Sequence, residues 1–216
     1  MPSQLAFYSL KIASPAGQSL LSVDHLQLID GLYALTGENG SGKSTLLRAI
    51  MGLHPIKAGT IKLDDADVRL DRRTFLQKSM YQPQNFTAYP ELTAFEFLVY
   101  FRRLRGVGKR ASKADARYWL GMMGLEVEAD RRLSTFSQGM LQRLGLAFIF
   151  QNASASLCLL DEPFAGVDPS ARQRHIRILA EHATDRVVIL CTHHVDEAVD
   201  VGAHILRLDA QTLTLR

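Results

Sequence analysis

Gly37-Glu38-Asn39-Gly40-Ser41-Gly42-Lys43-Ser44-Thr45 is the stretch from which the fold can be inferred, because it fits the pattern Gly-x-x-x-x-Gly-Lys-Ser/Thr. The apolar run 32–35 before it predicts a buried strand, and residues 45–51 after it have helical spacing. A strand that enters a glycine-rich turn and opens a helix presents backbone N–H groups and the positive helix end to an anion. The stretch is therefore typical of a phosphate-binding loop, in which Lys43 reaches the β- and γ-phosphates and the Ser44 hydroxyl lies on Mg²⁺.

The composition is that of an ordinary globular protein with its own hydrophobic core. The 216 residues are 47% hydrophobic and 22% charged, which suits one α/β domain with an inserted subdomain. The formal charge of +3 is too small to indicate a nucleic-acid partner, and we expect none. No apolar stretch is long enough to span a membrane, and the first residues lack the basic and apolar regions of a secretory signal, so we expect neither feature.

Two cysteines, Cys158 and Cys191, both fall inside apolar runs. We interpret them as small reduced core residues of a cytosolic protein, because free cysteine behaves as a buried apolar side chain. A zinc site would need histidines at ligand spacing, and none stand there.

The chain around the phosphate-binding loop has the alternation of strands. Turns are expected at 14–17 and 30–31, and residues 52–55 are expected to end the helix that follows the loop. Strands are predicted at 5–12, 20–29, 32–35 and 60–63.

Helical signals dominate the middle of the chain. Thr93 and Glu96 form a capping-box pattern ahead of an apolar helical face. Ser112 and Asp115 are expected to start a second helix, and a third is expected after Ser137.

Strand–helix alternation then resumes. Strands are predicted at 157–160 and 186–191, a helix from Asp168-Pro169 to about residue 182, a helix at 195–201, and a closing hairpin of 205–208 with 212–215. The expected fold is α/β, with a mainly parallel sheet in the core, an N-terminal antiparallel β subdomain and an inserted α-helical subdomain. The chain is expected to be a single domain over 1–216, with its core at 1–84 and 153–216 and the helical subdomain at 85–152.

Two carboxylates, Asp161 and Glu162, end the apolar strand 157–160. The carboxyl ends of parallel strands converge where ligands bind, so Asp161 can hold Mg²⁺ through water while Glu162 polarises an attacking water. The other interpretation is a carboxylate pair that merely caps a strand into a loop. Adjacent carboxylates are unfavourable unless a cation lies near, which favours the first interpretation.

The chain resembles the ATP-binding-cassette (ABC) ATPases over roughly residues 5–210, because six motifs follow one another in the order of that family. They are the phosphate-binding loop, Gln84 in a Tyr-x-Pro-Gln setting, 133–140, 159–163, 166–169 and 191–194. The resemblance implies a P-loop ATPase core that takes ATP and Mg²⁺.

The resemblance also implies a role for each matching residue. Ser44, Gln84 and Asp161 would organise Mg²⁺, Glu162 would position the attacking water, and His193 would contact the γ-phosphate. Ser137 and Gly139, in the family signature stretch, would contact ATP held by a second ATP-binding subunit. That subunit is the same chain in a homodimer or a different one in a heterodimer.

Some positions leave alternatives open. Gln82 is a neighbouring candidate for the role of Gln84, and His194 is the off-register alternative to His193. Gln138 stands where the family signature has its first glycine. Asp168 matches the loop that contacts the opposing subunit, and a simple helix N-cap is compatible with that role.

Two further features bear on binding. The family stacks an aromatic ring on adenine near a position that here is Ser14-Pro15, and neither Tyr8 nor Tyr33 is obviously in register. A basic run is either a solvated face or a contact for anionic lipid headgroups or an acidic loop of a membrane partner. It comprises Arg102, Arg103, Arg105, Lys109, Arg110, Lys113 and Arg117.

The resemblance is to the exporter-like subgroup with separate membrane subunits. It implies ATP hydrolysis that energises transport through an integral membrane subunit, with this chain on the cytoplasmic face of the inner (plasma) membrane. The alternative is a soluble ABC ATPase without a transport role, which acts in iron–sulfur assembly or associates with ribosomes or DNA. A P-loop kinase or GTPase would not explain the signature stretch or the Asp161-Glu162 pair.

Overall fold

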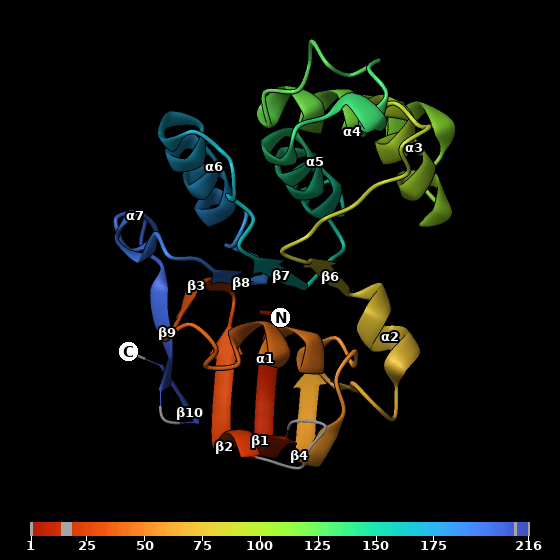
Figure 1. Ribbon diagram of the computed structural model, residues 1–216. Helices are drawn as coiled ribbons and strands as arrows, with labels where there is room; N and C mark the ends of the chain where they lie inside the picture. The colour runs from red at the N-terminus through yellow and green to blue at the C-terminus, as the bar shows by residue number, and fades with distance from the viewer. Residues whose placement is uncertain (1, 14–18, 210, 216) are drawn as a thin grey trace. The chain divides into compact units, whose positions relative to one another are not determined.

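The computed structural model describes residues 2–13, 19–209 and 211–215 (Figure 1). It divides into two compact units, which we name the sheet unit and the helical unit. The sheet unit comprises Met1–Tyr81, Ser154–Glu162 and Ile176–Arg216, and the helical unit comprises Gln82–Ala153 and Pro163–His175.

One sheet of ten strands runs through the described residues, in the order β5-β4-β1-β2-β10-β9-β3-β8-β7-β6. Its N-terminal strands are antiparallel, since β1 pairs with both β2 and β4. Its centre is parallel, since β3 pairs with β8 and β9, and β7 pairs with β8. The predicted α/β fold is confirmed. The strands are β1 (Gln4–Ala13), β2 (Ser19–Ile29), β3 (Gly31–Thr36), β4 (Ile56–Leu63), β5 (Ala66–Asp67), β6 (Ser79–Gln82), β7 (Leu157–Asp161), β8 (Val187–Cys191), β9 (His204–Asp209) and β10 (Thr212–Leu215).

The helix α1 (Lys43–Ile50) anchors the phosphate-binding loop to the core of the sheet unit. Its residues Leu46, Leu47 and Ile50 are buried against strand residues such as Phe7 and Ile61. Burying each such side chain contributes about 1.5–3 kcal/mol, so the start of α1 is held firmly. Figure 1 shows α1 lying across the strands β1, β2 and β4. The unit also holds α2 (Arg72–Gln77) and α7 (Val195–Val199).

The helical unit is built from α3 (Ala94–Leu104), α4 (Lys109–Met122) and α5 (Gln138–Phe150), with a 3-10 turn at Leu133–Thr135. Phe97 is central to its core, with ring centroids 4.8 Å from Phe101 and 5.6 Å from Phe148. The predicted capping box at the start of α3 is confirmed. Helix α6 (Pro169–Glu181) starts in this unit and ends in the sheet unit.

The prediction that Ser112 and Asp115 start a helix is wrong, because α4 begins three residues earlier, at Lys109. Ser112 is buried inside the helix, where its Oγ donates to the carbonyls of Val107 and Gly108 at 3.2 and 3.0 Å. Asp115 instead accepts a hydrogen bond from Arg102 Nε at 2.7 Å. Serine and aspartate can bond within or between helices as readily as they cap them, which is why the pattern misled.

Other boundaries also differ from the predictions. The strand β4 begins at Ile56 rather than residue 60, and α7 ends at Val199 rather than residue 201. The short elements β5, α2 and β6 were not predicted. The closing hairpin of β9 and β10 is confirmed, whereas the predicted turn at 14–17 lies outside the described residues. Within the part of the chain that the structure describes, no helix has the length and apolar character needed to cross a membrane.

Candidate functional site

The phosphate-binding loop depends on glycine at two positions. A Cβ at Gly37 would lie 2.5 Å from the carbonyl oxygen of Leu208, so only glycine lets the loop rest on β9. Gly42 is the N-cap of α1 with φ 101°, and it provides no side-chain cap. Because glycine has no side chain, no N-cap oxygen accepts a hydrogen bond from the N–H groups in the first turn of α1. An anion site requires this arrangement.

Lys43 supplies the positive charge of this loop. Only 9% of the residue is exposed, and its Nζ donates to the carbonyl oxygens of Gly37 and Glu38, each at 2.8 Å. These acceptors are neutral, so the ammonium charge is held inside the loop without being cancelled there by a carboxylate. That arrangement suits a phosphate.

Two side-chain oxygens lie close together beside the phosphate-binding loop. One belongs to Ser44, near the end of the loop, and the other to Asp161, at the end of β7. Ser44 Oγ donates to Asp161 Oδ1 at 3.1 Å, and the Tyr81 hydroxyl is 3.5 Å from Oδ2. Burial, followed by the charge of Asp161, raises the pKa of Tyr81 well above its usual range. Mg²⁺ prefers oxygen ligands and is often held by one carboxylate together with substrate phosphates. Among the described residues, no group of three or more His, Cys, Asp or Glu side chains could hold a metal ion.

Glu162 pairs with His193. The distance between Glu162 Oε1 and His193 Nε2 is 3.1 Å. Glu162 has a left-handed backbone, with φ 49°, and its N–H donates to the carbonyl of Cys191 at 3.0 Å. Burial raises the pKa of the Glu162 carboxyl, Asp161 raises it further, and His193 and Lys43 oppose the shift. A carboxylate with a raised pKa in a strained turn is typical of a general base.

His194 has other partners. Its backbone N–H donates to Thr192 Oγ1 at 3.1 Å, and its Nδ1 lies 4.0 Å from Glu197 Oε1. Of the two histidines, His193 is therefore the one in contact with Glu162.

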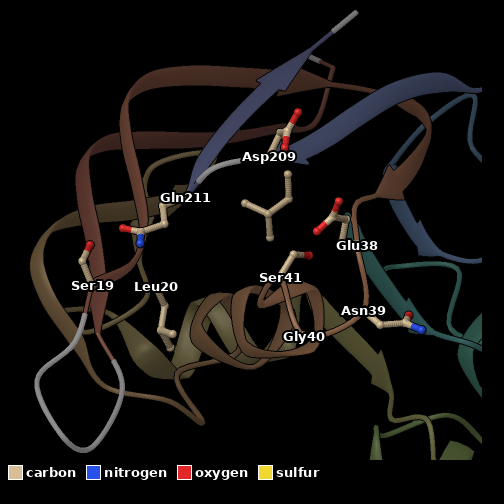
Figure 2. Close-up of a pocket in the computed structure, with 9 residues that line it drawn as sticks. Ser19, Leu20, Glu38, Asn39, Gly40, Ser41, Asp209 and Gln211 are labelled. Carbon is tan, nitrogen blue, oxygen red and sulfur yellow. The ribbon is translucent and has the colours of Figure 1, made fainter.

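A pocket of about 310 Å³ opens beside the phosphate-binding loop (Figure 2). Residues 38–41 form one side, and the β9–β10 hairpin and the start of β2 form the others. Ser41 Oγ is buried beside it, with no hydrogen-bond partner among the described residues. The pocket is lined by Ser19, Leu20, Glu38, Asn39, Gly40, Ser41, Leu208, Asp209 and Gln211. None of these residues is aromatic.

The aromatic expected on adenine remains unassigned in this region. Tyr33 is buried, and its hydroxyl donates to the carbonyl of Ile29 at 2.9 Å. Tyr8 lies on β1 with its ring centroid 5.1 Å from that of His25. Ser14-Pro15 falls outside the described residues.

The signature stretch lies in the helical unit, at the start of α5. Ser137 Oγ accepts a hydrogen bond from the Met140 N–H at 3.3 Å and caps the helix. A Cβ at Gly139 would collide with the carbonyl oxygen of Gly166, so this glycine is required for packing. Gln138, in contrast, is exposed.

Asp168 caps the start of α6. Its Oδ1 accepts hydrogen bonds from Ser170 Oγ at 2.7 Å and from the Ala171 N–H at 3.0 Å. Both hydrogen bonds lower the pKa of the Asp168 carboxyl, and the bond from the Ala171 N–H has the larger effect. The carboxylate is otherwise exposed.

Gln82 and Gln84 have different surroundings in the helical unit. Gln82 is fully buried, and its Nε2 donates to the carbonyl and Oε1 of Gln142. The Gln84 side chain is exposed. Gln84 is therefore the glutamine with an available side chain.

The sheet unit thus brings together Lys43, Ser44, Asp161, Glu162 and His193, whereas Gln84, Ser137 and Gly139 belong to the helical unit. Sequence reasoning overlooked Tyr81 beside Asp161 and Gln142 beside Gln82. The available signal for Gln142 was a glutamine among the apolar residues of 138–150.

Comparison with known proteins gives consistent results. The family model described as "ABC transporter" matches residues 29–165. "Retinal-specific phospholipid-transporting ATPase ABCA4" of Homo sapiens is 30% identical over 199 residues, which are 91% of this chain and 9% of that protein. "Uncharacterized ABC transporter ATP-binding protein YxlF" of Bacillus subtilis is 37% identical over 168 residues, 78% of this chain and 55% of YxlF.

Solved structures share the fold. "Structure of ATP binding subunit of ABC transporter" has a TM-score of 0.84 at 25% identity, covering 97% of this chain and 87% of that one. The structure of cbiO1 from Clostridium perfringens has a TM-score of 0.83 at 19% identity, covering 98% and 86%.

Proposed function

The chain belongs to the ABC transporter family, and on that premise we propose that it hydrolyses ATP to drive export through a separate membrane subunit. The family resemblance seen in the sequence is confirmed, and proteins of this family are ATP-binding ATPases. The observation that carries the proposal is the cluster of the sheet unit, in which Ser44 meets Asp161 and Glu162 meets His193.

Phosphate binding falls to the loop of residues 37–45. Lys43 and the N–H groups at the start of α1 hold the β- and γ-phosphates, because the loop is shaped by glycine and closed around a buried ammonium group. The neighbouring residues Glu38, Asn39, Gly40, Ser41 and Thr45 complete the loop.

Ser44, Asp161 and Gln84 organise Mg²⁺, and the first two fit that task as a pair of oxygens 3.1 Å apart. Mg²⁺ held there would neutralise negative charge on the phosphates.

Glu162 accepts a proton from the attacking water. Its raised pKa makes it a better base than an exposed glutamate. His193 orients Glu162 through their 3.1 Å contact and stabilises the γ-phosphate.

The helical unit acts on a second ATP-binding subunit, in either a homodimer or a heterodimer. Ser137 and Gly139 contact the ATP of that subunit from the start of α5, where N–H groups and the helix dipole favour an anion. The chain acts as one domain over 1–216, with core 1–84 and 153–216 and helical subdomain 85–152. It works at the cytoplasmic face of the inner membrane, peripherally bound to its membrane partner.

The deciding experiment replaces Glu162 by glutamine. Glu162→Gln should bind ATP as the unmodified protein does but hydrolyse it roughly 100-fold or more slowly, since it lacks the general base. Size-exclusion chromatography with ATP and Mg²⁺ should reveal a trapped dimer, because ATP stays intact between the subunits. Phosphate release gives the rate.

Glu197→Gln is the matched control, because it makes the same change on α7 at a residue with no proposed role. It should turn over ATP normally. A Glu162→Gln protein that stays monomeric and hydrolyses ATP at the unmodified rate would remove Glu162 from the mechanism.

A further inference from the structure

Gln142 is a fully buried glutamine on α5 that forms hydrogen bonds in two directions. Its Nε2 donates to the main-chain carbonyl of Gln84 at 2.6 Å. Its Oε1 accepts from Gln82 Nε2 at 2.6 Å, and Gln82 Nε2 also reaches the Gln142 carbonyl at 3.0 Å. One side chain thus connects helix α5 to both ends of the Gln82–Gln84 segment.

The orientation of these amides follows from hydrogen-bond chemistry. The carbonyl of Gln84 can only accept, so Gln142 must present its NH₂ group there. Its Oε1 then faces Gln82, which must present NH₂ in turn. The network has one self-consistent arrangement, and a buried polar network of this kind resists rearrangement because a broken bond leaves a desolvated group unpaired.

The packing of α5 makes room for the network. A Cβ at Gly145 would lie 2.5 Å from Gln82 Nε2, so the absence of a side chain at Gly145 admits the Gln82 amide. Gln82 Oε1 itself has no hydrogen-bond partner among the described residues.

We propose that Gln142 is a positioning residue for Gln84. It ties the main chain at Gln84 to α5, so that the Gln84 segment moves with the helix that begins at Ser137. The tether itself stands on the contacts within the helical unit, whereas its effect on ATP hydrolysis rests on the proposed function. Gln142 thereby couples Gln84, the glutamine proposed for Mg²⁺, to the helix proposed to contact the second subunit's ATP.

The experiment compares two glutamine-to-methionine variants of α5. Gln142→Met keeps the size of the side chain but removes both hydrogen bonds. Gln151→Met is the matched control, because Gln151 is also buried at the end of α5 and its amide has no hydrogen-bond partner among the described residues. Hydrogen–deuterium exchange of residues 84–88 in the ATP-free protein reports the tether without any turnover.

Exchange at residues 84–88 should rise several-fold in Gln142→Met and stay unchanged in Gln151→Met, because opening of a segment is limited by the bonds that hold it. Unchanged exchange in Gln142→Met, or an equal rise in both variants, would overturn the tether. The same two proteins then test the consequence for catalysis. Gln142→Met should lower kcat for ATP roughly tenfold with KM nearly unchanged, because a misplaced group costs rate rather than phosphate binding.

A double variant separates positioning from general structure. If Gln142 acts through Gln84, then Gln142→Met should add little to the loss already caused by Gln84→Ala. If the fold-losses in kcat of the two single variants multiply in the double variant, the positioning role is overturned. If Gln142→Met does not fold, Gln82→Met decides, with a smaller rise in exchange, since the bond between Gln142 and Gln84 remains. A lack of ATP hydrolysis in the unmodified protein would refute the proposed function, while the exchange data would still decide the tether.

Discussion

The starts of α1 and α5, both proposed to contact a phosphate, are built in opposite ways. Helix α1 begins at Gly42 in a left-handed conformation with no side-chain cap, behind a loop that holds Lys43. Helix α5 begins at Ser137, which caps its own helix through Met140 N–H. The first start offers the charge of Lys43, and the second offers a hydroxyl that already accepts a hydrogen bond within its own helix.

The difference indicates two different tasks. An uncapped start with a buried lysine can bind a phosphate by itself, because charge-assisted hydrogen bonds are the strong ones. A self-capped start held by the contact of Gly139 with Gly166 is complete without a ligand. It suits a surface that closes on a nucleotide already bound elsewhere. Variants at each of the two helix starts test this division.

The largest effect is expected from Lys43→Ala. The loop loses its only buried ammonium group, so ATP affinity should fall by roughly 100-fold and hydrolysis should fall with it. A thermal melt with and without ATP measures the binding, and ATP should no longer raise the melting temperature. The fold should survive, because the hydrogen bonds of Lys43 Nζ within the described part of the chain go to loop carbonyls alone.

Lys62→Ala is the control, since Lys62 is an exposed lysine of β4 in the same unit. ATP should stabilise it as it stabilises the unmodified protein. An equal rise in melting temperature for Lys43→Ala would show that the loop is not the binding site.

Ser137→Arg should have the next largest effect, and it should separate the two helix starts. ATP binding should be unchanged, because the loop of residues 37–45 is intact. Hydrolysis should fall roughly 100-fold, because the bulky arginine side chain at the α5 start would block closure on the second subunit's ATP and the Ser137 hydroxyl is gone. Ser154→Arg, at an exposed serine without a proposed role, should retain both properties.

Mixing sharpens the test of composite sites. In a dimer of one Ser137→Arg subunit with one Lys43→Ala subunit, one site combines both lesions and the other combines two intact halves. Partial recovery of activity would support sites shared between subunits. Full turnover by Ser137→Arg alone would contradict the proposed role of the α5 start.

The smallest effect is expected from Ser137→Ala. The loss of a serine N-cap should lower the free energy of unfolding by about 1 kcal/mol, as measured by urea denaturation. ATP turnover should fall several-fold because the hydroxyl is gone, while ATP binding stays. Asp71→Ala removes the comparable N-cap of α2 in the sheet unit and should cost similar stability without loss of turnover. Equal turnover in the two variants would leave Ser137 a capping residue alone.

Local patterns predicted the elements whose chemistry is local. The capping box of Thr93 and Glu96 was recognisable because both bonds lie within one helical turn. The same reasoning failed at Ser112, because its hydroxyl donates back to the carbonyls of Val107 and Gly108, just before the helix. The short elements α2 and β6 were missed, because a few residues carry too little periodicity.

The candidate site divides along the same line. Residues 37–45 and the carboxylates at the end of β7 were apparent from spacing and type, because glycine, lysine and paired carboxylates have few other uses in that order. The sequence left two choices open, between Gln82 and Gln84 and between His193 and His194. Burial of Gln82 and the contact of His193 with Glu162 bear on those choices, and both depend on residues far apart in the chain.

The sequence by itself therefore determined the α/β fold, the family and the phosphate-binding loop, because each depends on short-range spacing and a recognisable order of motifs. Only the tertiary structure decided which distant polar groups meet: Ser44 with Asp161, Glu162 with His193, and Gln142 with Gln82 and Gln84. The physical reason is that a buried polar side chain bonds whatever partner packing places within about 3 Å, and packing depends on the whole chain.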